Sequence, residues 1–387
     1  MVLRMNSRER LLTTMNFQEP DRVPFDLGST QVTGINEIAY RNLRKAYGLP
    51  DKEVVYSDQV QGLALPDEDF LNLICADTRG LFPLNAHNWN VQVTDGGDYW
   101  LYHDEWGITY RKPKTNGLYF SIVQEPLKNE KLTPDSIKNY QWPNFKDPVR
   151  IQGFKELAEE FHSKGLAVVI KDPFAGIFEM AQRICGMDYL LMLMASEPEI
   201  AGLLFDKMLE LKIDFFSSAL PSLGDSIDVI GLIDDYGTQV SQLISPRMFR
   251  NQIKPRLKEV FNCIKTLAPN AKRFFHSCGN VRPLIPDFLE IGVQILNPIH
   301  IKATGMDPSE LKKDYGDKIV FWGGGIDTQG ILPMGTPQEV REDVKRNLEA
   351  LMPGGGYIFN TIHNIQADVP PENLVAMIET LHIYGVY

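Results

Sequence analysis

The feature that most constrains the fold is an alternation of short apolar strands with amphipathic helices, which sets in near residue 167. Six segments are strand-length, apolar and rich in β-branched or aromatic residues: 167–172, 228–234, 273–276, 293–296, 319–322 and 356–360. Helical stretches separate them, the longest over 198–219, 246–267, 337–351 and 370–384. Near-continuous apolar strands between helices are typical of a parallel sheet covered on both faces.

Two further strands, predicted over 23–28 and 54–58, raise the number of strands to eight. Eight such units favour a closed barrel over an open sheet, and no G-x-G-x-x-G follows the first strand. A helix from Arg8 to Met15, capped by Asn6 or Ser7, precedes that strand. We therefore predict an α/β protein, one domain over 1–387, with a (β/α)₈ TIM barrel and an N-terminal helical extension.

One segment departs from this rhythm and predicts a small antiparallel β insertion within about 79–125. Residues 91–110 alternate apolar with polar side chains, and turn residues interrupt them at 95–98 and 104–107. This pattern is typical of a meander of antiparallel strands. Long insertions in barrels usually lie at a rim and shape the mouth of the active site. A patch that covers one side of the barrel is an equally good interpretation.

Charge and composition exclude several classes of partner. The net charge is −11 and no basic cluster interrupts it, so we expect neither nucleic acid nor a membrane surface as a partner. No apolar run reaches the ~18 residues that cross a bilayer. The first residues lack the pattern of a signal peptide, and the four cysteines are scattered without paired spacing. We therefore expect a cytoplasmic protein without a disulfide framework.

The strongest candidate site follows the predicted strand at 273–276. His276 and Cys278 are two residues apart, so both point to the same side of a strand. Their imidazole and thiolate are a zinc-type ligand pair. His363, after the last strand, would supply a third ligand and leave the fourth position open, as in catalytic zinc sites. A hydrogen-bonded buried histidine beside a small packed cysteine is the alternative, and this spacing alone does not decide between them.

Polar residues at other strand ends extend the candidate site, because barrel active sites lie at the carboxyl ends of the strands. Glu179 is a candidate catalytic residue, either as an additional ligand or as a partner to a ligand histidine. Asp234 and Asp327 are the other two candidate catalytic residues. Caps of helices and turns are the alternative role for such residues. The candidate substrate-binding residues are Asp235, Tyr236, Asn297, Gln329 and Asn364, with Phe174, Met180 and Trp322 as apolar walls or core.

Taken together, several motifs resemble the uroporphyrinogen decarboxylase superfamily across nearly the whole chain. They are SRERLL at 7–12, PDRVP at 20–24, GTQ at 237–239, SPRMF at 245–249, HSCGN at 276–280, GGIDTQ at 324–329 and PPEN at 370–373. Decarboxylases of this superfamily carry an arginine-rich segment at the first strand, which binds the substrate carboxylates. Residues 25–31 read FDLGSTQ here and contain no arginine, although Tyr56-Ser-Asp58 is similar to the decarboxylases' pyrrole-binding segment.

The resemblance extends to a branch of zinc methyltransferases that exchange a methyl group with a corrinoid (cobalamin) carried on a partner protein. Their ligands are a histidine and a cysteine in an H-x-C-G segment and a later cysteine. His276 and Cys278 match the first two, and His363 stands where the later cysteine is expected. The resemblance thus implies Zn²⁺, a corrinoid protein as partner and a small-molecule methyl donor or acceptor. A uroporphyrinogen decarboxylase and a non-catalytic small-molecule-binding barrel are the alternatives.

Overall fold

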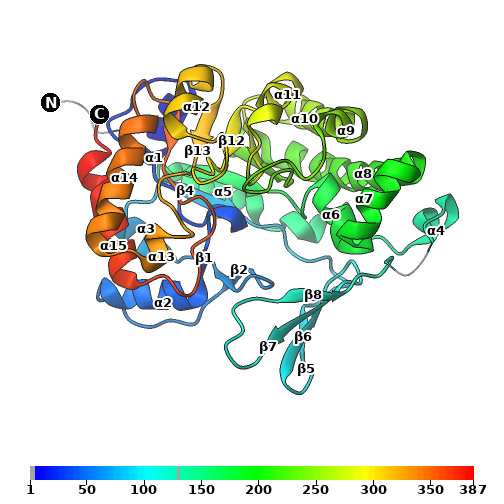
Figure 1. The fold of residues 1–387 in the computed structure, drawn as a ribbon. Helices are drawn as coiled ribbons and strands as arrows, with labels where there is room; N and C mark the ends of the chain where they lie inside the picture. The colour runs from blue at the N-terminus through cyan, green and yellow to red at the C-terminus, as the bar shows by residue number, and fades with distance from the viewer. Residues whose placement is uncertain (1–4, 129–130) are drawn as a thin grey trace.

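A curled sheet of parallel strands forms the centre of the protein (Figure 1). The computed structural model describes residues 5–128 and 131–387; residues 1–4, part of the start for which we expect no signal peptide, lie outside them. The strands follow one another in chain order around the sheet: β4 (Thr78–Leu81), β9 (Ala167–Lys171), β10 (Val229–Ile233), β11 (Lys272–His276), β12 (Ile295–Asn297), β13 (Val320–Trp322) and β14 (Tyr357–Ile358).

The segment 23–27 joins the two edges of this sheet. Phe25 pairs in parallel with Phe359, next to β14, and its carbonyl accepts a hydrogen bond of 2.7 Å from the backbone N–H of Asp77, next to β4. The predicted TIM-barrel-like fold is thereby confirmed. The prediction that 54–58 forms a barrel strand is wrong, because Tyr56–Asp58 (β2) pairs antiparallel with Leu63–Ala64 (β3) in a separate small sheet with β1 (Ile35–Asn36).

The barrel position expected for 54–58 is occupied by β4. Its sequence, TRGL, does not predict a buried strand. Two of its four residues are polar and bond to carboxylates of other segments, so the strand has no apolar run. The Thr78 hydroxyl donates to Asp26 at 2.6 Å, and Arg79 pairs with Glu68 at 2.7 Å. A strand whose polar residues bind partners within the fold therefore shows neither the apolar run nor the alternation that predicts strands.

Alternate residues of the strands fill the interior of the barrel. Residues of one parity on strands β9 to β14 form a cluster separate from the one that packs against the helices. Because side chains alternate between the two faces of a strand, polar residues that continue this parity at the carboxyl ends face the mouth of the barrel. The interior cluster contains Ala167, Val169, Val229, Ile233, Phe274, Ile295, Val320, Trp322 and Ile358, with Leu11 and Met15 from the first helix.

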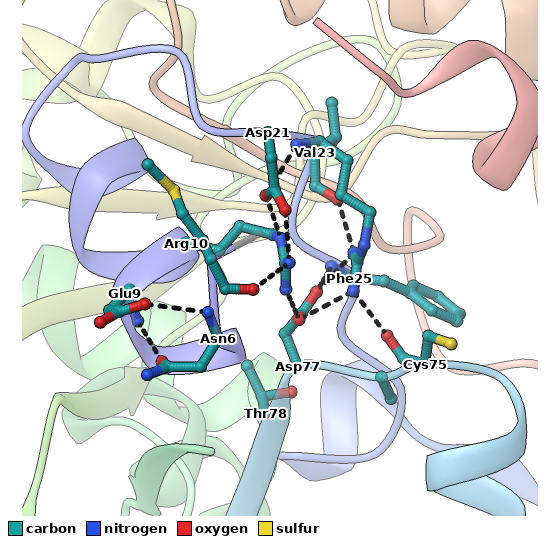
Figure 2. Close-up of polar contacts among 12 residues, drawn as sticks. Asn6, Glu9, Arg10, Asp21, Val23, Phe25, Cys75, Asp77 and Thr78 are labelled. Atoms are coloured by element: carbon teal, nitrogen blue, oxygen red, sulfur yellow. Dashed lines mark hydrogen bonds and ion pairs between the residues drawn. The ribbon is translucent and has the colours of Figure 1, made fainter. Parts of the chain in front are cut away.

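An ionic network fixes the closing segment (Figure 2). Asp77 is fully buried, and its carboxylate accepts from Arg10 and Arg22 at 2.7 Å each and from the backbone N–H of Phe25 at 2.8 Å. Arg10 belongs to α1 (Ser7–Met15) and also pairs with Asp21 at 2.6 Å. The network therefore holds the first helix, the segment 23–27 and the start of β4 together.

Helices cover the outside of the barrel, and an antiparallel sheet projects from it (Figure 1). Among the described residues, no helix is long and apolar enough to span a membrane. The projecting sheet consists of β5 (Gln92–Asp95), β6 (Tyr99–His103), β7 (Thr109–Pro113) and β8 (Ser121–Gln124). The covering helices are α5 (Phe154–Ser163), α6 (Ile177–Cys185), α7 (Met187–Ser196), α8 (Pro198–Leu223), α10 (Lys254–Leu267), α11 (Ile285–Ile291), α12 (Pro308–Tyr315), α14 (Pro337–Leu351) and α15 (Pro371–Tyr384).

Candidate metal centre and cavity

Three ligand-type side chains converge at the carboxyl end of the barrel. One donor atom from each of His276, Cys278 and His363 lies within 4.8 Å of the other two. Sγ of Cys278 is 3.4 Å from Nε2 of His276, and the two imidazole rings have centroids 5.6 Å apart. Two imidazoles and one thiol form the donor set of a catalytic zinc site with an open position. These residues therefore fit a zinc ion.

Asn297 orients the first of these donors. Its Oδ1 lies 2.5 Å from Nδ1 of His276, and its Nδ2 donates to the carbonyl of Trp322 at 2.8 Å. Because the amide oxygen can only accept, Nδ1 carries the proton and Nε2 presents its lone pair to Cys278. Asn297 was predicted to bind substrate. Its contacts instead give it the part of an outer partner that fixes the ligand histidine.

A close contact between two loops places Cys278. Gly279 has φ +84°, and a Cβ on it would lie 2.5 Å from the backbone of Gly237. The loops after β10 and β11 can approach this closely only because glycine stands at both positions. The backbone N–H of Cys278 donates to Oδ1 of Asp235 at 2.7 Å, and this oxygen is 3.6 Å from Nε2 of His276. Asp235 therefore lies beside the candidate metal centre.

Burial sets the protonation of the three donors. Removal from water lowers the pKa of His276 and of His363 to about 4, so both imidazoles are neutral at pH 7. Burial, together with the carboxylates of Asp235 and Glu179, raises the pKa of the Cys278 thiol well above its ordinary value. A cation between the three would stabilise the thiolate and offset this cost. The electrostatics thus match the chemistry of the donor set.

A cavity of about 470 Å³ opens directly beside these donors. Its lining includes His276 and His363 together with Glu179 and Asp235. Glu179, on α6, accepts from Arg183 at 2.6 Å, so this predicted residue faces the cavity as half of an ion pair. Aromatic walls come mainly from the segment between β4 and β9: Phe82, Trp89, Tyr102, Trp106, Tyr110 and Phe174.

Asp234 lies behind the cavity wall and holds the helix that carries Glu179. Its fully buried carboxylate accepts the backbone N–H groups of Phe178 at 3.0 Å and of Glu179 at 2.9 Å, and the hydroxyl of Tyr236. A Cβ on Gly176 would lie 1.9 Å from Cγ of Asp234, so only glycine allows this close approach. Asp234 was predicted to be catalytic and Tyr236 to bind substrate. Neither lines the cavity, and their contacts give both a positioning role.

Asp327, Gln329 and Asn364 also lie outside the cavity lining, whereas the predicted wall residues Phe174 and Met180 belong to it. Asp327 accepts the backbone N–H groups of Gln329 at 2.9 Å and of Gly330 at 3.2 Å, as a turn residue does. The side chain of Gln329 bonds to that of Gln239 at 2.7 Å. Asn364 donates to Gln61 at 2.7 Å and is itself buried. The turn role that the sequence offered as an alternative fits Asp327, whereas Gln329 and Asn364 are engaged by side chains distant in the sequence.

Charged residues that the sequence interpretation did not single out also line the cavity. Lys171, Arg183 and Arg150 supply cations, and Asp104 and Glu105 supply carboxyl groups. Burial raises the pKa of Asp104 to about 6. The signal that could have identified Lys171 is its place at the end of a predicted strand with the parity of the barrel interior. The others lie in the insertion or on helices, where no such rule applies.

A parallel α/β barrel with a polar cavity at the carboxyl ends of its strands is the architecture of barrel enzymes. Residues 126–384 match the uroporphyrinogen decarboxylase (URO-D) family, and the chain belongs to that family. The uroporphyrinogen decarboxylase of Pseudoalteromonas translucida is 26% identical over 199 residues, 49% of this chain and 50% of that protein. That of Psychromonas ingrahamii is 25% identical over 193 residues, 48% and 49% of the two chains.

The chain spans about half the length of the curated relatives it matches. A solved structure, described as a methyltransferase from Methanosarcina mazei, aligns over 98% of this chain and 99% of its own, with a TM-score of 0.63. At 18% sequence identity this likeness shows a shared fold. Family and fold together place the chain in a group of barrel enzymes.

Proposed function

We propose that the protein is a zinc-dependent methyltransferase that moves a methyl group between a small molecule and the cobalt of a corrinoid protein. The observation that carries this proposal is the convergence of His276, Cys278 and His363 on one point beside a cavity. The shared fold with a methyltransferase supports it. A decarboxylase needs fixed cations for its substrate carboxylates, and the segment 25–31 provides none.

The residues at the candidate metal centre would have distinct roles in this reaction. His276, Cys278 and His363 would hold Zn²⁺, which as a Lewis acid activates the heteroatom that gains or loses the methyl group. Asn297 keeps Nε2 of His276 unprotonated and aimed at Cys278. Glu179, which lines the cavity beside Arg183, would accept a proton where the small molecule is the methyl acceptor. The corrinoid protein would dock over the barrel mouth.

Metal analysis of variants tests the ligand assignment. We expect about one zinc per chain in the purified protein and its loss in His276→Ala, Cys278→Ala and His363→Ala. Matched controls are His103→Ala, on the projecting sheet, and Cys263→Ala, on α10, which should both retain zinc. Zinc content unaffected by the three ligand substitutions would refute the assignment. A methyl-transfer assay with cob(I)alamin and a panel of methylated ethers, amines and thiols then tests the reaction.

A second candidate is uroporphyrinogen decarboxylation, which the names of the relatives and the position of Asp58 favour. Asp58 lines the cavity, in the segment similar to the decarboxylases' pyrrole-binding segment. The two arginines of the cavity, Arg150 and Arg183, already pair with Glu105 and Glu179. Release of CO₂ from a porphyrinogen by chelator-treated protein would establish this candidate. The methyltransferase proposal expects no such release.

A further inference from the structure

Among the described residues, one cation of the cavity, Lys171, has no carboxylate oxygen within 4.0 Å of its ammonium group. Lys171 is the last residue of β9 and pairs in register with Gly231 of β10. It has the same parity as Ala167 and Val169, which belong to the interior cluster, so its side chain points into the barrel rather than toward the helices. It lines the same cavity as His276 and His363. The ammonium therefore shares one space with the candidate metal centre.

The nearby carboxylates are engaged elsewhere. Asp172, the next residue, faces the opposite side of the strand and pairs with Lys212 at 2.6 Å. Glu179 pairs with Arg183, and Asp58 accepts from the backbone N–H of Gln61 at 2.9 Å. Within residues 5–128 and 131–387, no carboxylate oxygen lies within 4.0 Å of Nζ of Lys171, and no hydrogen-bond acceptor contacts it.

A charged ammonium group at this position raises the free energy of the ligand-free protein. Burial lowers the pKa of Lys171, which expresses the cost of keeping its charge away from water. Arg150 and Arg183, in the same cavity, offset this cost with glutamates at 2.5 Å and 2.6 Å. An anionic group of a ligand would give Lys171 the partner that the chain does not supply.

We propose that Lys171 binds an anionic group of the small molecule, so that the ligand class is a compound with a carboxylate or sulfonate. The aromatic walls, among them Trp106 and Phe174, suit an apolar body attached to that group. The link between this anion site and methyl transfer rests on the proposed function. The anion site itself requires no metal and can be tested without one.

Calorimetric titration of the metal-free protein with benzoate, benzenesulfonate and neutral benzamide tests the site. We expect at least one of the two anions to bind, and benzamide to bind more weakly. Lys171→Met should weaken anion binding about tenfold to a hundredfold, because a charged hydrogen bond is lost. Lys171→Arg should retain most of the affinity. The matched control is Lys272→Met, since Lys272 has the interior parity at the opposite end of β11 and lies outside the cavity lining.

Thermal unfolding separates a lost site from a lost fold. Removal of a partly buried charge that has no carboxylate within 4.0 Å among the described residues should leave the melting temperature of ligand-free Lys171→Met unchanged or raise it. Absence of anion binding to the wild type, or equal anion affinity in wild type and Lys171→Met, would overturn the proposal. Loss of the zinc assignment with anion binding intact would overturn the methyltransferase proposal alone. Zinc binding and methyl transfer without a role for Lys171 would overturn only the anion site.

Discussion

Replacement of Asn297 by alanine is expected to weaken zinc binding without touching any ligand atom. The substitution leaves Nδ1–H of His276 and the carbonyl of Trp322 without partners in a fully buried site. Each orphaned buried group costs roughly 1–3 kcal/mol, so for the two groups the free energy of unfolding should fall by about 2–6 kcal/mol. Loss of an outer partner of a ligand histidine typically lowers metal affinity about tenfold to a hundredfold.

Competition with a fluorescent zinc chelator measures the affinity, and urea unfolding of the metal-free protein measures the stability. Asn373→Ala is a matched control, since Asn373 is equally buried and donates to two carbonyls, of Leu332 and Gly335. It should lower stability but leave zinc affinity unchanged. If Asn297→Ala and Asn373→Ala retain the same zinc affinity as the wild type, Asn297 does not orient a ligand, and the reasoning fails.

Three further predictions concern the framework of the site. Gly279→Ala places a Cβ 2.5 Å from the backbone of Gly237, so we expect lower thermal stability and loss of zinc; a fully zinc-loaded variant would contradict this. Lys212→Met leaves Asp172 buried and unpaired at a cost of about 3–5 kcal/mol by urea unfolding, and Asp172→Leu in addition should recover much of it. Burial raises the pKa of Asp234 to about 7 in the folded protein, above the ordinary value that it has when unfolded. The folded state therefore holds an extra proton between about pH 4 and 7, and stability falls as pH rises through this window. The wild type should lose stability relative to Asp234→Asn over that range, and a pH-independent difference would refute the shift.

The sequence allowed the barrel and its metal-ligand candidates to be predicted where periodicity and strand parity apply. The strands β9 to β14 were found because their central residues are mostly apolar on both faces. His276 and Cys278 were found because two-residue spacing on a strand fixes a common direction. The strand β4 was missed because its polar residues pair internally. The contacts of Asp234 with α6 could not be predicted, because a carboxylate at a strand end and a carboxylate that caps a neighbouring helix have the same local sequence.

The charged residues of the cavity could not be predicted from the sequence, for a different reason. Arg183 and Asp104 enter the cavity from a helix and from the insertion, and no local rule tells which face of these elements turns toward the barrel. Lys171 differs, since parity alone places it inside. The lack of a carboxylate beside it, among the described residues, depends on the three-dimensional surroundings and cannot be predicted from the sequence.

The projecting sheet β5–β8 has a consequence for how such a site diversifies. The ligand-type residues sit on β11 and after β14, whereas Tyr102 and Tyr110, two of the aromatic wall residues, sit on β6 and β7. Under the proposed function the barrel strands would carry the metal ligands and Lys171, and the appended sheet would add part of the wall that a bound compound contacts. Exchange of the sheet between relatives would alter the choice of compound while the chemistry stays in place.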